Sequence, residues 1–153
     1  MRMGYRPTLS DSTFGLAFVC VTPQPNAPPL CVVLLDDDPL DVRLICDALQ
    51  AGMNCRVTVL DSKPALLLNL WKELPDVVIS DTNLPGFNGL KALELIQSLH
   101  PGIPFVICSG SNSPEMRAKV LAAGAKAWVP KSNLHRLVAV VNLVCEQMKR
   151  PGA

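Results

Sequence analysis

The chain has 153 residues, of which 49% are hydrophobic and 18% are charged, and its net charge is +1. Its mean hydropathy of +0.29 is high, yet no apolar run approaches the roughly 20 residues that a membrane-spanning helix needs. We therefore expect one cytoplasmic domain with buried strands and no membrane contact. The small net charge gives no reason to expect direct nucleic-acid binding.

The first 30 residues differ in kind from the rest, because they hold five prolines and few charges. The apolar stretch "FGLAFVCV" (14–21) has no small-residue cleavage site after it, which argues against an export signal. We therefore expect a disordered or loosely docked extension over residues 1–30. The domain itself is expected over 31–150, with a short tail over 151–153.

From Leu30 onward, short apolar strands alternate with amphipathic helices. The expected strands cover residues 31–35, 55–60, 77–80, 105–108 and 125–129. The expected helices cover residues 39–52, 63–74, 89–99, 113–124 and 133–150. Asp38 is placed to cap the first helix, with Pro39 in its first turn. Apolar strands joined by helices predict an α/β fold, a doubly wound five-stranded parallel sheet covered on both faces.

Polar residues follow the strands at their carboxyl ends. Asp36 and Asp37 follow the first strand, Asp81 the third, Ser109 the fourth and Lys131 the fifth. Ligands of such sheets bind outside the carboxyl ends of the strands, so we expect these residues to meet at one edge. Crowded carboxylates repel one another, so one of them must have a raised pKa or a cation must neutralise them. Acids, a hydroxyl and a lysine together can hold a divalent cation and bind a phosphoryl group in transfer.

With these motifs at their mutual spacing, residues 31 to about 149 resemble the receiver domain of two-component response regulators. The resemblance rests on Asp36-Asp37, on "SDTNLPGFNG" (80–89), on Ser109-Gly110 and on Lys131. It implies the flavodoxin-like (βα)5 fold with strand order 2-1-3-4-5. It also implies a phosphoacceptor signalling domain that assists its own phosphorylation and dephosphorylation, and not an enzyme acting on a separate substrate.

The resemblance also implies roles for single residues. Asp81 accepts a phosphoryl group from the phosphohistidine of a sensor histidine kinase or a histidine phosphotransfer protein. Mg²⁺ is held by Asp36 and Asp37, by Asp81 and by the backbone carbonyl of Asn83, a ligand set that suits this cation. Ser109 and Lys131 bind the new phosphate.

Trp128 falls at the aromatic switch position of the family, and a surface formed by the fourth helix, fifth strand and fifth helix carries the output. Two features depart from the family pattern. Ser132 follows Lys131 where proline is usual, so this loop is expected to be set differently, and Trp128 is larger than the usual Tyr or Phe.

The last helix carries a candidate contact surface for a downstream partner or a second copy. Its core stripe leaves Val140 and Leu143 pointing away from the sheet. Only three residues follow Arg150, so we expect output through a partner, through self-association or through phosphate relay to another protein. A receiver cut from a longer protein would look the same.

Three other functions would use parts of the same pattern. A haloacid-dehalogenase-type phosphatase would use Asp36 and Asp38, but it needs acids soon after Lys131, and none occurs before Glu146. A flavodoxin-like electron carrier would need a phosphate-binding loop where the acids lie. A receiver-like module that binds partners without phosphorylation stays open.

Overall fold

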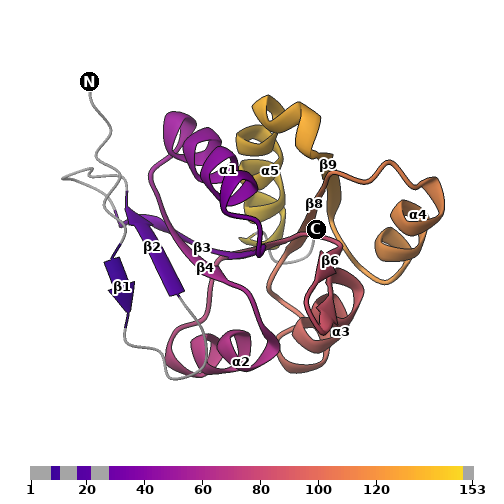
Figure 1. The fold of residues 1–153 in the computed structure, drawn as a ribbon, viewed down its shortest axis with the longest axis horizontal. Helices are drawn as coiled ribbons and strands as arrows, with labels where there is room; N and C mark the ends of the chain where they lie inside the picture. The colour runs from indigo at the N-terminus through magenta and orange to yellow at the C-terminus, as the bar shows by residue number, and fades with distance from the viewer. Residues whose placement is uncertain (1–7, 11–16, 22–27, 150–153) are drawn as a thin grey trace.

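The computed structural model describes residues 8–10, 17–21 and 28–149. Five parallel strands form most of its main sheet (Figure 1). They are β3 (Leu30–Leu35), β4 (Cys55–Leu60), β5 (Val77–Ser80), β8 (Phe105–Ser109) and β9 (Ala127–Pro130). Their order is β4-β3-β5-β8-β9, which is the predicted 2-1-3-4-5 arrangement. The predicted flavodoxin-like fold is therefore confirmed.

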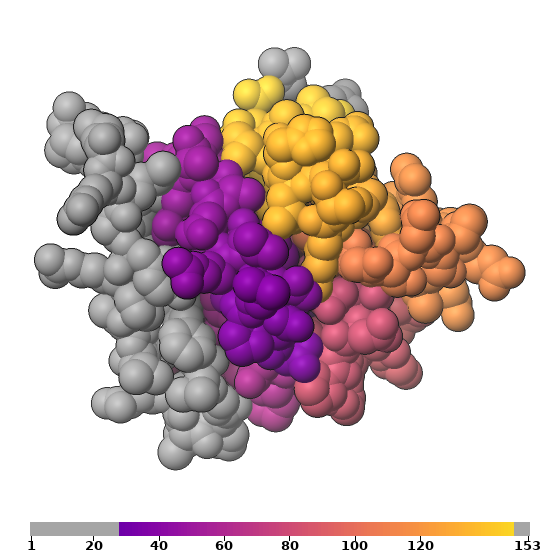
Figure 2. Space-filling view, turned by 45° about the horizontal axis from the view of Figure 1, so that its top comes forward, coloured from indigo at the N-terminus to yellow at the C-terminus, as the bar shows by residue number. Residues whose placement is uncertain are grey.

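Helices cover both faces of this sheet. They are α1 (Pro39–Gly52), α2 (Lys63–Lys72), α3 (Gly89–Leu99), α4 (Pro114–Ala122) and α5 (Leu137–Lys149). One apolar cluster lies between the sheet and α1 and α5, and a second lies between the sheet and α2, α3 and α4. Figure 2 shows α1 and α5 side by side on one surface, with α4 projecting at the edge.

Local capping explains where the helices begin. The Asp38 side chain accepts hydrogen bonds from the backbone N–H groups of Leu40 and Asp41, at 2.9 and 3.3 Å. Ser62, Asn88 and Ser113 cap α2, α3 and α4 in the same way. A capping oxygen satisfies a backbone donor that has no partner inside the helix, so these starts could be read from the sequence.

The last predicted helix is divided in two. Residues Lys131–Arg136 form a 3-10 helix, η1, and α5 begins only at Leu137. Asn133, inside η1, departs from helical geometry with φ −125° and ψ 42°. Because η1 begins directly after β9, Lys131 lies at the end of that strand and faces the start of α1. All peptide bonds in the described residues are trans.

Two further strands lie in the segment expected to be disordered or loosely docked. β2 (Ala17–Val21) pairs antiparallel with the free edge of β4, and β1 (Thr8–Ser10) pairs antiparallel with β2. They extend the main sheet from five strands to seven. An open strand edge offers unpaired backbone donors and acceptors, which an apolar segment such as "AFVCV" can satisfy. The domain boundary at residue 30 stays a prediction.

A small hairpin precedes α3. It consists of β6 (Asn83–Leu84) and β7 (Phe87–Asn88), with Gly86 at φ 65° in its turn. The sequence did not indicate these strands, because two-residue strands have no periodic pattern to detect. The hairpin returns the chain to Gly89, whose N–H donates to the carbonyl of Thr82 at 3.0 Å.

The prediction that Val140 and Leu143 both point away from the core is wrong for Val140. Val140 is partly buried and packs against the apolar cluster below α1 and α5. The apolar face of α5 is broader than the narrow stripe assumed, so it includes this position. Leu143 is 56% exposed, as expected. Within the described residues, no helix is long and apolar enough to cross a membrane.

Candidate functional site

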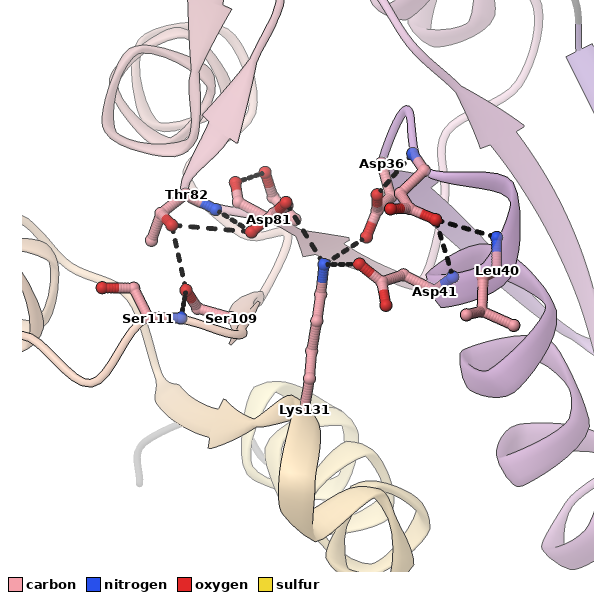
Figure 3. A network of polar contacts seen from close by, with 10 residues as sticks. Asp36, Leu40, Asp41, Asp81, Thr82, Ser109, Ser111 and Lys131 are labelled. Carbon is pink, nitrogen blue, oxygen red and sulfur yellow. Dashed lines mark hydrogen bonds and ion pairs between the residues drawn. The ribbon is translucent and has the colours of Figure 1, made fainter.

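The candidate site lies at the carboxyl ends of β3 and β5, the two central strands (Figure 3). Leu35 and Ser80 are paired in register at the ends of these strands. The next residues along the chain, Asp36 and Asp81, therefore emerge side by side. One carboxylate oxygen from each of Asp36, Asp37 and Asp81 lies within 4.8 Å of the others.

Asp36 is the buried acid of this group, with 1% of its surface exposed. Its Oδ1 accepts a hydrogen bond from the backbone N–H of Asp38 at 3.0 Å. Its Oδ2 lies 2.9 Å from Nζ of Lys131 but accepts no aligned hydrogen bond in the described residues. Burial raises the pKa of Asp36, and the nearby charge of Asp81 raises it further. The crowding of acids predicted one raised pKa, and the structure adds that burial is its first cause.

Lys131 is the only cation at the centre of the described acids, and it contacts three of them. Its Nζ lies 2.7 Å from Asp41, 2.9 Å from Asp36 and 3.2 Å from Asp81. Burial alone would lower the pKa of Lys131, but its hydrogen bond to Asp41 and its close contact with the Asp36 carboxylate outweigh burial and raise that pKa. Lys131 therefore stays protonated and offsets part of the negative charge of the site.

Asp41 is a site residue that the sequence reasoning missed. It lies in the first turn of α1, where an acid is expected anyway because it interacts favourably with the helix dipole. Its ion pair with Lys131 joins residues 90 positions apart. The sequence held no signal for this pair beyond the general crowding of acids in the early chain.

Thr82 is a second missed residue, and it lies between Asp81 and Ser109. Its backbone N–H donates to Oδ1 of Asp81 at 2.8 Å, and its hydroxyl lies 3.0 Å from the hydroxyl of Ser109. The backbone N–H of Ser111 also donates to the Ser109 hydroxyl at 3.0 Å. Thr82 and Ser109 are both buried. The sequence reasoning treated Thr82 only as part of a loop motif.

Two other predicted residues, Asn83 and Trp128, differ in whether they face the acid cluster. Asn83 is exposed and, with Asp37 and Asp81, lines an open cavity of about 570 Å³ above the acids. Trp128 does not face this cavity. It is buried in the apolar cluster on the side of α2, α3 and α4, on β9, which β8 separates from β5.

Comparison with known proteins settles the family. The family model of the response regulator receiver domain matches residues 32–142, most of the described chain. The chain belongs to the response regulator receiver domain family. This assignment agrees with the resemblance inferred from the acid pair and the strand-end motifs, and it places the domain among those of two-component systems.

Two related proteins are longer than this chain. The DNA-binding transcriptional regulator NtrC of Salmonella typhimurium is 28% identical over 111 residues, which cover 72% of this chain and 24% of NtrC. A protein-glutamate methylesterase/protein-glutamine glutaminase of Clostridium acetobutylicum is 34% identical over 103 residues, covering 65% of this chain and 30% of that protein. The chain thus spans about a quarter to a third of the length of these relatives.

A solved structure of a putative response regulator from Chloroflexus aurantiacus has a similar fold. Its TM-score is 0.71 at 24% identity, and the match covers 78% of this chain and 99% of that one. At this identity the likeness concerns the fold alone. It agrees with the order of the five parallel strands.

The acid cluster has the donors that a small divalent cation requires. Carboxylate and carbonyl oxygens are the ligands that Mg²⁺ prefers, and it keeps several waters, which an open cavity can admit. Oδ2 of Asp36 is buried without a hydrogen bond, and such an atom is stabilised by a nearby positive charge. One ammonium facing four acids (Asp36, Asp37, Asp41 and Asp81) leaves the receiver site with excess negative charge. The residues present therefore fit a Mg²⁺ site.

Proposed function

We propose that this receiver domain is a phosphorylation-controlled switch in which Asp81 is the phosphoacceptor. The observation that carries the proposal is the position of its carboxylate. It lies within the cluster formed with Asp36 and Asp37, 3.2 Å from Nζ of Lys131, and it borders an open cavity. A phosphodonor can reach this carboxylate from solvent, and the Lys131 ammonium can contact the transferred phosphoryl group from the protein side.

The reaction exchanges one bond to phosphorus for another. A carboxylate oxygen of Asp81 forms a P–O bond as the P–N bond of the donor phosphohistidine breaks, and the bonding electrons remain on the imidazole nitrogen. The Lys131 ammonium stabilises the charge on the phosphoryl oxygens. Asp36, Asp37, Asp81 and the carbonyl of Asn83 would hold Mg²⁺, which supplies further positive charge there when bound.

The output follows from the position of Ser109 at the end of β8. A phosphoryl group on Asp81 offers Ser109 a new, strongly charged hydrogen-bond acceptor. Ser109 lies at the start of the loop into α4, and β8 pairs with β9, which carries Trp128. A movement of Ser109 therefore changes the surface formed by α4, β9 and α5, which would contact a downstream partner or a second copy. Leu143 is the exposed apolar residue that α5 contributes.

The phosphatase alternative requires a second functional acid beside Asp36. In that alternative Asp38 would act two residues after Asp36, as a general acid. The Asp38 side chain instead caps α1 through the N–H groups of Leu40 and Asp41. We therefore propose that the chain's own chemistry is limited to gaining and losing a phosphoryl group, in the cytoplasm, with a histidine kinase or histidine phosphotransfer protein as donor.

Intact mass after incubation with acetyl phosphate and Mg²⁺ tests the proposal. We expect a single Mg²⁺-dependent phosphate adduct that disappears in Asp81→Asn. A matched control is Asp47→Asn, which changes an exposed aspartate of α1 that pairs with Arg43 at 3.9 Å and should keep the adduct. Steady release of phosphate from unrelated monoesters would favour the phosphatase. Mg²⁺ binding without an adduct would leave a binding module that works without phosphorylation.

A further inference from the structure

The hydroxyl of Ser109 does not contact Asp81 directly. In the part of the chain that the structure describes, its hydrogen-bond partners are the hydroxyl of Thr82 and the backbone N–H of Ser111, both at 3.0 Å. The Thr82 hydroxyl lies 3.5 Å from Oδ1 of Asp81, and the Thr82 backbone N–H donates to the same oxygen at 2.8 Å. Figure 3 shows Thr82 between the two residues.

The chemistry of these groups gives the contacts a direction. The Ser111 N–H can only donate and the Asp81 carboxylate can only accept, while each hydroxyl carries one proton. A Thr82 hydroxyl that donates to Oδ1 of Asp81, at 3.5 Å, has its lone pairs left to accept from Ser109. In this arrangement the Ser109 proton is directed at Thr82, with 3.0 Å between the two hydroxyl oxygens.

We propose that Thr82 is a positioning residue that holds the Ser109 hydroxyl away from the phosphoacceptor and thereby opposes the switch. The inference rests on the proposed function of Asp81. To donate to a phosphoryl oxygen on Asp81, Ser109 must give up its hydrogen bond to Thr82. Both residues are buried, with 1% of Ser109 and 5% of Thr82 exposed, so water does not readily replace the lost partner.

The size of the effect follows from one buried hydrogen bond between neutral groups. Such a bond shifts an equilibrium by about fivefold. A variant without the Thr82 hydroxyl should therefore bind a phosphoryl mimic about fivefold more tightly. This gain requires Ser109, because only Ser109 moves from Thr82 to the bound group.

Titration of the full chain with beryllium fluoride in the presence of Mg²⁺, followed by calorimetry, tests this. Four variants are compared with the unchanged protein: Thr82→Val, Thr82→Ser, Ser109→Ala and the double variant Thr82→Val/Ser109→Ala. Thr82→Val keeps the shape of the side chain and loses the hydroxyl, whereas Thr82→Ser keeps the hydroxyl. We expect about fivefold tighter binding for Thr82→Val, no gain for Thr82→Ser, and equal affinities for Ser109→Ala and the double variant.

A second measurement needs no phosphoryl mimic. The amide NMR signal of Ser111 reports its hydrogen bond to Ser109, so it should shift in Thr82→Val and stay in place in Thr82→Ser. Unchanged binding by Thr82→Val, or the same gain when Ser109 is absent, would overturn the positioning role. If the unchanged protein binds no beryllium fluoride and forms no Asp81 adduct, the proposed function fails, and this inference fails with it.

Discussion

Replacing Gly89 with alanine should destabilise the protein and displace the backbone of the phosphoacceptor. A Cβ at this position would lie 2.5 Å from the carbonyl oxygen of Asp81 and 3.1 Å from Cα of Thr82. Ordinary contacts begin at 3.4 Å, so the shortest one falls about 0.9 Å short. Both neighbours are backbone atoms that cannot rotate away. Overpacking of this kind costs about 1–3 kcal/mol in the free energy of unfolding.

Urea denaturation of Gly89→Ala measures this cost, and the rate of adduct formation with acetyl phosphate measures the effect on Asp81. Gly102→Ala is the control, because a Cβ there meets nothing within 4 Å and no positive φ is involved. The control should be unchanged or more stable by up to about 1 kcal/mol, since alanine restricts the unfolded chain. If Gly89→Ala matched the unchanged protein in both stability and rate, the reasoning from close backbone approach would be refuted.

Three further predictions concern the charges of the site. Lys131→Met leaves the fully buried Asp36 side chain without its cation. In the absence of Mg²⁺ and at neutral pH, this change should lower the free energy of unfolding by about 3 kcal/mol. Urea denaturation should show a smaller loss at acidic pH, where Asp36 is protonated. The raised pKa of Asp36 means that, just above its ordinary pKa, the folded state holds a proton that the unfolded chain has released. Stability contributed by this group is therefore lost as pH rises through the raised pKa, and Asp36→Asn should flatten that part of a plot of melting temperature against pH. Asp41→Asn removes the 2.7 Å hydrogen bond that Lys131 donates to Asp41, so the pKa of Lys131 measured by NMR should fall. Calorimetry should show a smaller loss of Mg²⁺ affinity for Asp41→Asn than for Asp36→Asn, because Asp41 lies outside the three-acid cluster. An unchanged Lys131 pKa would contradict the last expectation.

Patterns within short stretches of the chain identified most of the fold. The apolar run before Asp36 predicts a strand because it matches a strand buried on both faces. Asp38 and Pro39 predict a helix start because their preferences act on neighbouring backbone groups. Since parallel strands end at the same edge, the sequence is enough to place the acids after the first and third strands together.

Contacts between distant segments could not be read in this way. The pairing of β2 with the edge of β4 depends on an open strand edge, which exists only after the sheet has formed. The burial of Val140 depends on the extent of the apolar cluster that α5 packs against, which the periodicity of α5 does not specify. Both features were missed because their cause lies in a surface assembled from the whole chain.

The sequence by itself determined the strand-helix alternation and the acids at the strand ends, because neighbouring residues along the chain are enough to specify them. Only the tertiary structure decided which further side chains join the predicted ones. Asp41 reaches Lys131 across 90 residues, and Thr82 reaches Ser109 across 27. Hydrogen bonds and ion pairs require particular atoms within about 3 Å, and that proximity is set by the packing of the helices and strands, not by spacing in the sequence.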